Sequence, residues 1–307
     1  MSEDRREVAE HLPVMVDEIT FFLRPERGGW IVDATVGLGG HAEAMLARGP
    51  ACHLLGIDRD REALALARAR LARFGERVAL VHGNFLEIQQ ICEEAGVNFP
   101  RGILFDLGLS SYQLAATGRG FSFEKDEPLD MRMDPTEGPT AAQLLNQLSE
   151  TELARILFEY GQEPRARRIA RAIVARRQRQ PIQTTRDLVE VVKTAVPRKA
   201  WPRRIHVATR SFQAVRILVN QELSSLAQAL PDAARLLDHG GRLAVISFHS
   251  LEDRIVKQTI RALTAEGEWA GLEPAPIVPI DEEVRMNPRS RSAKLRVVER
   301  VSGNRHE

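Results

Sequence analysis

The 307-residue sequence has few residues that crosslink a chain or anchor it in a membrane. Its only cysteines, Cys52 and Cys92, lie 40 positions apart and form no CxxC motif. This argues against a disulfide framework or a zinc site and suits a reducing compartment. No run of about 18 apolar residues occurs, and the charged residues 1–14 lack the apolar core of a secretory signal. We therefore expect a cytoplasmic protein without a transmembrane helix.

The sequence also has almost no net charge, but its charges are unevenly distributed. The formal net charge is +1, whereas residues 155–216 contain 16 Lys or Arg and only 4 Asp or Glu. Seven of these cations are arginines between Arg165 and Arg179. A basic segment on an otherwise acidic chain predicts a polyanionic partner such as nucleic acid. The alternative is a charged helix balanced by the acidic remainder of the protein.

Short apolar runs alternate with helical patterns in the first third of the chain. This alternation predicts βαβ units and a parallel, Rossmann-like α/β sheet. Strands are expected at 30–33, 54–58, 78–82, 102–106 and 242–247, with a strand-like tail at 295–301. Because the sheet pattern resumes after roughly a hundred residues rich in helical and basic sequence, we predict an insertion. The predicted parts are an α/β domain at 1–112 and 206–307, and an inserted, basic helical domain for substrate recognition at 113–205.

Three of the predicted strands end in aspartate, at Asp33, Asp58 and Asp106. Open α/β sheets bind ligands at the carboxyl edge, where these side chains would meet. The segment DATVGLGGH follows the first strand, and its glycines let the backbone approach a ligand at a helix N-terminus. Asp58 lies 18 positions after Gly40, where a carboxylate can accept hydrogen bonds from ribose hydroxyls. These features suit NAD and S-adenosylmethionine equally, so a nicotinamide-dependent dehydrogenase is one alternative.

A series of motifs in order along almost the whole chain resembles the ribosomal RNA small subunit methyltransferase H family, also called MraW. Shorter members of the series are YGQE, RIARAIV, TRSFQAVRI and VNQEL. The longer ones are HLPVMVDE at 11–18, DATVGLGGH at 33–41, GIDRD at 56–60, DLGLSSYQL at 106–114, RGFSF at 119–123, PLDMRMDP at 128–135, ISFHSLEDR at 246–254 and NPRSRS at 287–292.

The resemblance implies a class I methyltransferase fold and transfer of the S-adenosylmethionine methyl group to N4 of a cytidine in the decoding region of 16S ribosomal RNA. The implied partner is this RNA or the small ribosomal subunit, with no DNA and no membrane. Two departures are visible: residues 264–284 form a shorter segment than in some members, and Tyr112 stands where proline is common. By matching motifs, the implied cofactor-binding residues are Gly39, Gly40, His41, Asp58, Phe85, Asp106 and Gln113.

Cytosine N4 is a poor nucleophile, so an oxygen that accepts its amino proton would assist methyl transfer. We predict that Asp106 or the loop through Ser110 and Ser111 supplies it, or that backbone carbonyls of this loop do so if Asp106 binds the cofactor. Carbon-5 methylation would need a cysteine nucleophile, and neither cysteine follows the fourth strand. We expect no metal ion.

Other residues have two interpretations each. His249 either contacts the substrate or satisfies local hydrogen bonds. Phe121 and Phe123 either hold an unstacked base or pack their loop. A third function, besides the methyltransferase and the dehydrogenase, is an RNA-binding assembly factor whose cofactor pocket is vestigial.

Overall fold

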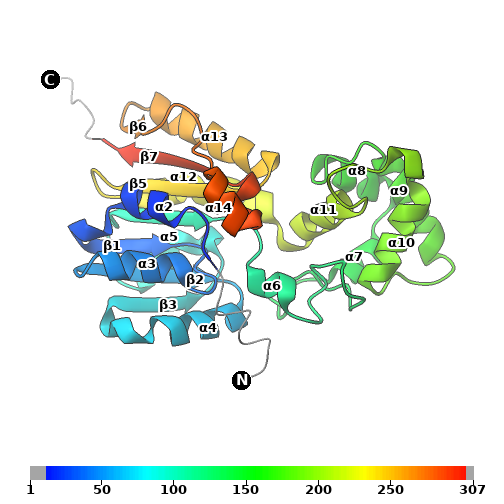
Figure 1. The fold of residues 1–307 in the computed structure, drawn as a ribbon, viewed down its shortest axis with the longest axis horizontal. Coiled ribbons are helices and arrows are strands. Elements are labelled where there is room, and N and C mark those ends of the chain that lie inside the picture. The colour runs from blue at the N-terminus through cyan, green and yellow to red at the C-terminus, as the bar shows by residue number, and fades with distance from the viewer. Residues whose placement is uncertain (1–11, 302–307) are drawn as a thin grey trace. The chain divides into compact units, whose positions relative to one another are not determined.

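A computed structural model of the protein describes residues 12–301, and the chain in it divides into two compact units (Figure 1). The first is an α/β unit formed by the chain up to Ser110 and from Leu223 onward. The second is a helical unit formed by residues 111–222. His11, which begins the first of the longer motifs, lies outside the described residues.

A seven-stranded sheet with the order β3-β2-β1-β4-β5-β7-β6 forms the centre of the α/β unit. Strands β1 to β5 are parallel, β7 is antiparallel to β5, and β6 is antiparallel to β7. The predicted strands are confirmed, whereas β6 was not predicted. The strands are β1 (Gly29–Asp33), β2 (Cys52–Asp58), β3 (Val78–His82), β4 (Gly102–Asp106), β5 (Arg242–Ser247), β6 (Trp269–Gly271) and β7 (Lys294–Arg300).

Helices bury both faces of this sheet, as the continuous apolar character of its parallel strands requires. Alternation along β4 shows the two faces: Ile103 and Phe105 belong to the core under α5, α12 and α13, whereas Leu104 belongs to the core under α2, α3 and α4. No helix of the described residues is long and apolar enough to cross a membrane. The helices are α2 (Val16–Leu23), α3 (Gly40–Arg48), α4 (Arg61–Leu71), α5 (Ile88–Glu94), α12 (Glu222–Leu236), α13 (Ser250–Ala265) and α14 (Asp281–Met286).

The helical unit is built from short helices that begin with strong capping signals. Capping boxes pair Thr140 with Gln143, Ser149 with Glu152 and Thr184 with Asp187, so that side chains satisfy the first backbone N–H groups of three helices. The helices are α6 (Ser111–Ala115), α7 (Ala141–Gln147), α8 (Glu150–Glu159), α9 (Ala166–Arg177), α10 (Thr185–Ala195) and α11 (Thr209–Asn220).

The helical unit extends further along the chain than the predicted insertion at 113–205. Helix α11, which the prediction assigned to the α/β domain, packs against α8 and α7. Its buried side chains include Phe212, Val215 and Ile217, so α11 contributes to the core of the helical unit. The helical periodicity of residues 210–238 spans both α11 and α12, and periodicity alone does not indicate which core a helix joins.

Asn220, at the end of α11, holds the long loop before α7 in place. Its Oδ1 accepts a hydrogen bond from the backbone N–H of Met133 at 2.7 Å, and its Nδ2 donates to the carbonyl of Met131 at 2.7 Å. Asn220 is buried, so bulk solvent does not compete for these backbone groups. The residue therefore fixes the path of the PLDMRMDP motif.

We predict that Asn220→Ala destabilises the protein by about 3 kcal/mol, because it leaves a buried N–H and a buried carbonyl without partners. Urea unfolding followed by far-ultraviolet circular dichroism measures the change. Exposed Gln180→Ala serves as the control. Equal stability of the two variants would show that the loop does not depend on Asn220.

Candidate functional site

The carboxyl edge of the sheet in the α/β unit carries the three predicted aspartates. Asp33 ends β1, Asp58 ends β2 and Asp106 ends β4. These strands are neighbours, because β1 pairs with both β2 and β4. Burial is the main cause of the raised pKa of Asp33, and repulsion from Asp106 and Asp58 adds to it, as expected for carboxylates that share one edge.

Asp58 ties the glycine turn to the end of β2. Its Oδ2 accepts a hydrogen bond from Gly37 N at 2.8 Å, and its Oδ1 accepts one from Asp60 N at 2.9 Å. Burial raises the pKa of Asp58 to about 6, although these two hydrogen bonds oppose the shift. Because a carboxylate oxygen accepts more than one hydrogen bond, Asp58 can hold the turn and a ligand hydroxyl together.

The turn itself depends on glycine. Gly39 has φ +81° and precedes the first residue of α3, Gly40. A Cβ on Gly39 would lie 3.2 Å from Leu71 Cδ1 as well as in a backbone conformation that L-residues rarely adopt. The first N–H groups of a helix have no intrahelical partner, so those at the start of α3 can donate to a polar ligand group.

Asp106 is paired with His41 of the first turn of α3. His41 Nε2 lies 3.4 Å from Asp106 Oδ2, and Asp106 N donates a hydrogen bond to Thr35 Oγ1 at 2.7 Å. Burial by itself lowers the pKa of His41, but the neighbouring Asp106 carboxylate outweighs it and raises the pKa above its ordinary value. Among the described residues, His41 Nδ1 and Asp106 Oδ1 are buried atoms without a hydrogen-bond partner. Such orphaned atoms suit a bound polar molecule.

Asp33 is the residue of this edge to which the sequence prediction gave no role. Its side chain is buried, and Oδ1 accepts a hydrogen bond from Thr35 N at 3.2 Å. Burial raises its pKa to about 7, against the opposing effects of His41 and of the Thr35 hydrogen bond. Two features of the sequence could have pointed to a role for Asp33: it ends a strand beside the glycine turn, and it is the first residue of the DATVGLGGH motif.

The remaining predicted cofactor residues are Phe85 and Gln113. Phe85 follows β3 and is half-buried, with its ring edge-on to Phe105 at 5.5 Å between centroids. Gln113 belongs to α6 of the helical unit, where its side chain is buried. The structure thus brings Gly39, Gly40, His41, Asp58 and Asp106 to one edge of the α/β unit, with Phe85 after the neighbouring strand.

The loop after β4 is partly described. Leu107 N donates to Ile246 O at 3.1 Å, which continues the β4–β5 pairing by one residue. Gly108 has φ +102°, and a Cβ there would lie 3.4 Å from the ring of Phe248. The side chain of Ser111 lies outside the described part of the structure, so its predicted role in proton acceptance stays a prediction.

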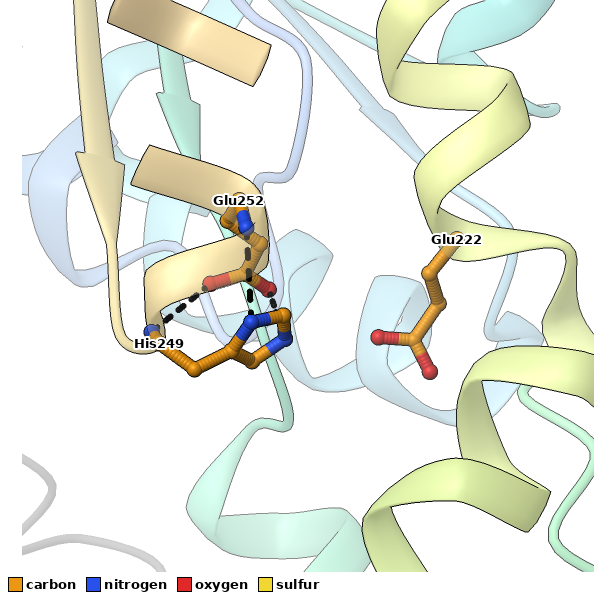
Figure 2. A group of neighbouring side chains, drawn as sticks. All are labelled: Glu222, His249 and Glu252. Carbon is orange, nitrogen blue, oxygen red and sulfur yellow. Dashed lines mark hydrogen bonds and ion pairs between the residues drawn. The ribbon is translucent and has the colours of Figure 1, made fainter. Parts of the chain in front are cut away.

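His249 caps a helix. It is the N-cap of α13, and its Nδ1 accepts a hydrogen bond from Glu252 N at 3.3 Å, while Nε2 lies 3.1 Å from Glu252 Oε1 (Figure 2). The other carboxylate oxygen of Glu252 accepts from Phe248 N at 2.8 Å and from His249 N at 3.2 Å. Of the two interpretations of His249, the local hydrogen-bonding role is therefore the one that the contacts display.

The two phenylalanines of the RGFSF motif pack within the helical unit. Phe121 is buried, and Phe123 stacks on His206 with ring centroids 4.6 Å apart. Phe123 also contacts Phe212 of α11 edge-on at 5.3 Å. Both rings thus stabilise their loop, as one of the two interpretations predicted.

We predict that Asp33→Asn raises the melting temperature at pH 8 by about 5 °C and that the gain at pH 5 is less than half as large. A carboxyl whose folded-state pKa exceeds its unfolded value opposes folding as pH rises, fully so above the folded-state pKa. With a folded pKa of about 7, Asp33 is ionised and buried at pH 8. Exposed Asp281→Asn is the control, and an equal gain for Asp33→Asn at both pH values would contradict the burial effect.

Comparison with known proteins places this arrangement in a family. The chain is 50% identical to the ribosomal RNA small subunit methyltransferase H of Geotalea uraniireducens (strain Rf4), over 95% of this chain and 98% of that protein. It is also 50% identical to the protein of the same name from Syntrophotalea carbinolica, over 96% and 99% of the two chains. A solved rRNA methylase from Streptococcus thermophilus aligns with a TM-score of 0.45 and 11% identity, over 95% of this chain and 99% of its own. The sequence model of a protein family, described as the MraW methylase family, matches residues 8–301 of this chain. The chain belongs to the MraW methylase family.

Proposed function

We propose that this protein transfers the methyl group of S-adenosylmethionine to N4 of a cytidine in the decoding region of 16S ribosomal RNA. The observation that carries the proposal is the glycine turn held by Asp58 at the same sheet edge as the His41–Asp106 pair, in a member of the MraW methylase family. The names of the relatives, which specify ribosomal RNA of the small subunit, support this choice of substrate. Family membership also favours a methyltransferase over a dehydrogenase.

The donor groups at the edge fit S-adenosylmethionine. The Asp58 carboxylate would accept hydrogen bonds from the ribose hydroxyls. The N–H groups at Gly39 and Gly40 and the orphaned oxygen of Asp106 would meet the polar groups of the methionine part. Phe85 would cover the adenine, and the cofactor role of Gln113 is carried over from the family motif DLGLSSYQL.

Catalysis in this proposal rests on positioning and on proton acceptance. When bound, S-adenosylmethionine supplies an electrophilic methyl group. Asp106, which lies beside His41, would accept a hydrogen bond from the cytosine amino group and so favour its attacking form. If Asp106 is occupied by the cofactor, carbonyls of the loop 107–110 take over this role.

The substrate is held in this proposal by the basic helical unit. Phosphates of the RNA would contact its arginines, which makes binding sensitive to salt. We expect no DNA partner and no membrane, and a location in the cytoplasm together with the small ribosomal subunit.

We predict that the protein labels one cytidine when it is incubated with tritiated S-adenosylmethionine and small subunits from cells that lack this activity. Mass spectrometry of nuclease fragments identifies the nucleotide and the modified nitrogen. Binding of S-adenosylhomocysteine without any labelling would refute the proposed reaction. Energy transfer to bound NADH would instead support the dehydrogenase.

We predict that Asp58→Ala weakens binding of S-adenosylhomocysteine by about 100-fold or more, because it removes charged hydrogen bonds to the ribose and releases the glycine turn. Calorimetry measures the affinity, and Asp58→Asn is the conservative comparison. RNA binding should persist, since Asp58 lies outside the helical unit. Loss of both activities together would indicate misfolding or a wrong assignment of the cofactor site.

A further inference from the structure

The arginines of α9 are less available than the sequence indicates. Arg177 donates to the carbonyls of Leu145 and Leu148, at 2.8 and 2.7 Å, and thereby caps the C-terminus of α7. Arg176 forms an ion pair with Asp187 at 3.0 Å. Two of the seven arginines between 165 and 179 therefore hold the helical unit together.

The following part of the same unit carries as many cations, and fewer of them are paired. Residues 191–221 contain seven Lys or Arg and no Asp or Glu. Among the described residues, only Arg216 of these seven forms an ion pair, with Glu222 at 2.8 Å. The exposed cations of this segment are Lys193, Arg198, Lys199, Arg203 and Arg204. Because an ordinary solvated surface mixes both signs of charge, this accumulation calls for an anionic partner.

Four of these cations lie on the structured loop after α10, and Lys193 lies in the last turn of α10 itself. The backbone of 198–200 forms a 3-10 turn, in which Ala200 N donates to Pro197 O and Trp201 N donates to Arg198 O. Trp201 is half-buried and its Nε1 donates to Val196 O at 2.9 Å, while the Arg198 guanidinium lies 5.8 Å from its ring centroid. An ordered loop loses less conformational entropy on binding than a mobile one.

The far end of the loop is fixed by an aromatic contact. His206 stacks on Phe123, and its Nδ1 accepts a hydrogen bond from Ala208 N at 3.2 Å. Burial lowers the pKa of His206, and the positive charge of Lys193 lowers it further. Lys193 of α10 therefore lies within electrostatic reach of His206 at the end of the loop.

We infer that residues 193–204, here called the basic loop, bind the phosphate backbone of the RNA substrate, and that they contribute more to this binding than α9 does. The inference rests on the proposed function. Phosphates repeat along the RNA strand, so they match several cations spaced along one loop. The arginines offer planar pairs of donors that fit phosphate oxygens.

The test measures binding of a fluorescein-labelled single-stranded RNA of 20 nucleotides by anisotropy, over a series of KCl concentrations. The loop variant is Arg203→Gln/Arg204→Gln, and the matched variant on α9 is Arg167→Gln/Arg168→Gln, whose arginines are also exposed. For the loop variant we expect affinity to fall at least tenfold at low salt. The slope of log K against log salt should fall by about 1.4, which is about 0.7 for each phosphate that is no longer neutralised. For the α9 variant we expect a change of less than threefold.

Two controls separate charge from folding. Arg203→Lys/Arg204→Lys keeps the charge and should retain most of the affinity. Affinity for S-adenosylhomocysteine and the melting temperature should stay unchanged in the loop variant, because both side chains are exposed and have no partner among the described residues.

The outcomes distinguish this inference from the proposed function. If the unchanged protein methylates small subunits while the α9 variant loses as much RNA affinity as the loop variant, or more, the inference is wrong and the function stands. If the unchanged protein neither binds RNA nor methylates subunits, both are wrong. If the loop variant bound ribosomal proteins less tightly than the unchanged protein but bound RNA equally well, the inference would also be wrong.

Discussion

Burial of negative charge at one sheet edge is the constraint to which the rest of the α/β unit is adapted. Three parallel strands end in aspartate, and desolvation of their carboxylates is costly. The protein offsets the cost locally: Gly37 and Asp60 donate to Asp58, Thr35 donates to Asp33, and His41 pairs with Asp106. The glycine turn is part of this solution, since its backbone must approach Asp58 closely enough to donate. A polar ligand would donate the missing hydrogen bond to the oxygen of Asp106 that still lacks a partner among the described residues.

Most of the α/β unit was predictable because its signals are local. Five parallel strands and the tail strand follow from short apolar runs, and the aspartates follow from the points where three of those runs stop. The three-residue β6 could not be predicted, because WAG has no periodicity of its own and pairs only because β7 lies beside it. The helical unit ends later in the chain than the predicted insertion for a related reason. The apolar face of α11 fits either core, and only tertiary packing assigns it to α8 and α7.

Individual side chains were harder to predict than elements, because residue type does not identify the partner. Arg176 and Arg177 have the same chemistry as the exposed Arg167 and Arg168. Nevertheless, Arg176 pairs with Asp187, and Arg177 caps the C-terminus of α7. His249 has the residue type of a catalytic group and is used as a helix cap. Asp33 was visible as a strand end, but its nearly complete burial depends on the packing of residues distant in sequence. The cofactor roles carried over from the family motifs stay predictions of this kind.

The insertion also governs the order in which the chain can fold during synthesis. Gly102 of β4 pairs with Arg242 of β5, and the 139 residues between them include the whole helical unit. Its helices make mainly local contacts, which form fast and can form early. β5, in contrast, emerges only after them, and β7 later still. During that interval β4 has no neighbour on one side, although Ile103, Leu104 and Phe105 are fully buried in the finished sheet. The nascent protein therefore exposes an unpaired, aggregation-prone strand edge for as long as the ribosome takes to translate the insertion.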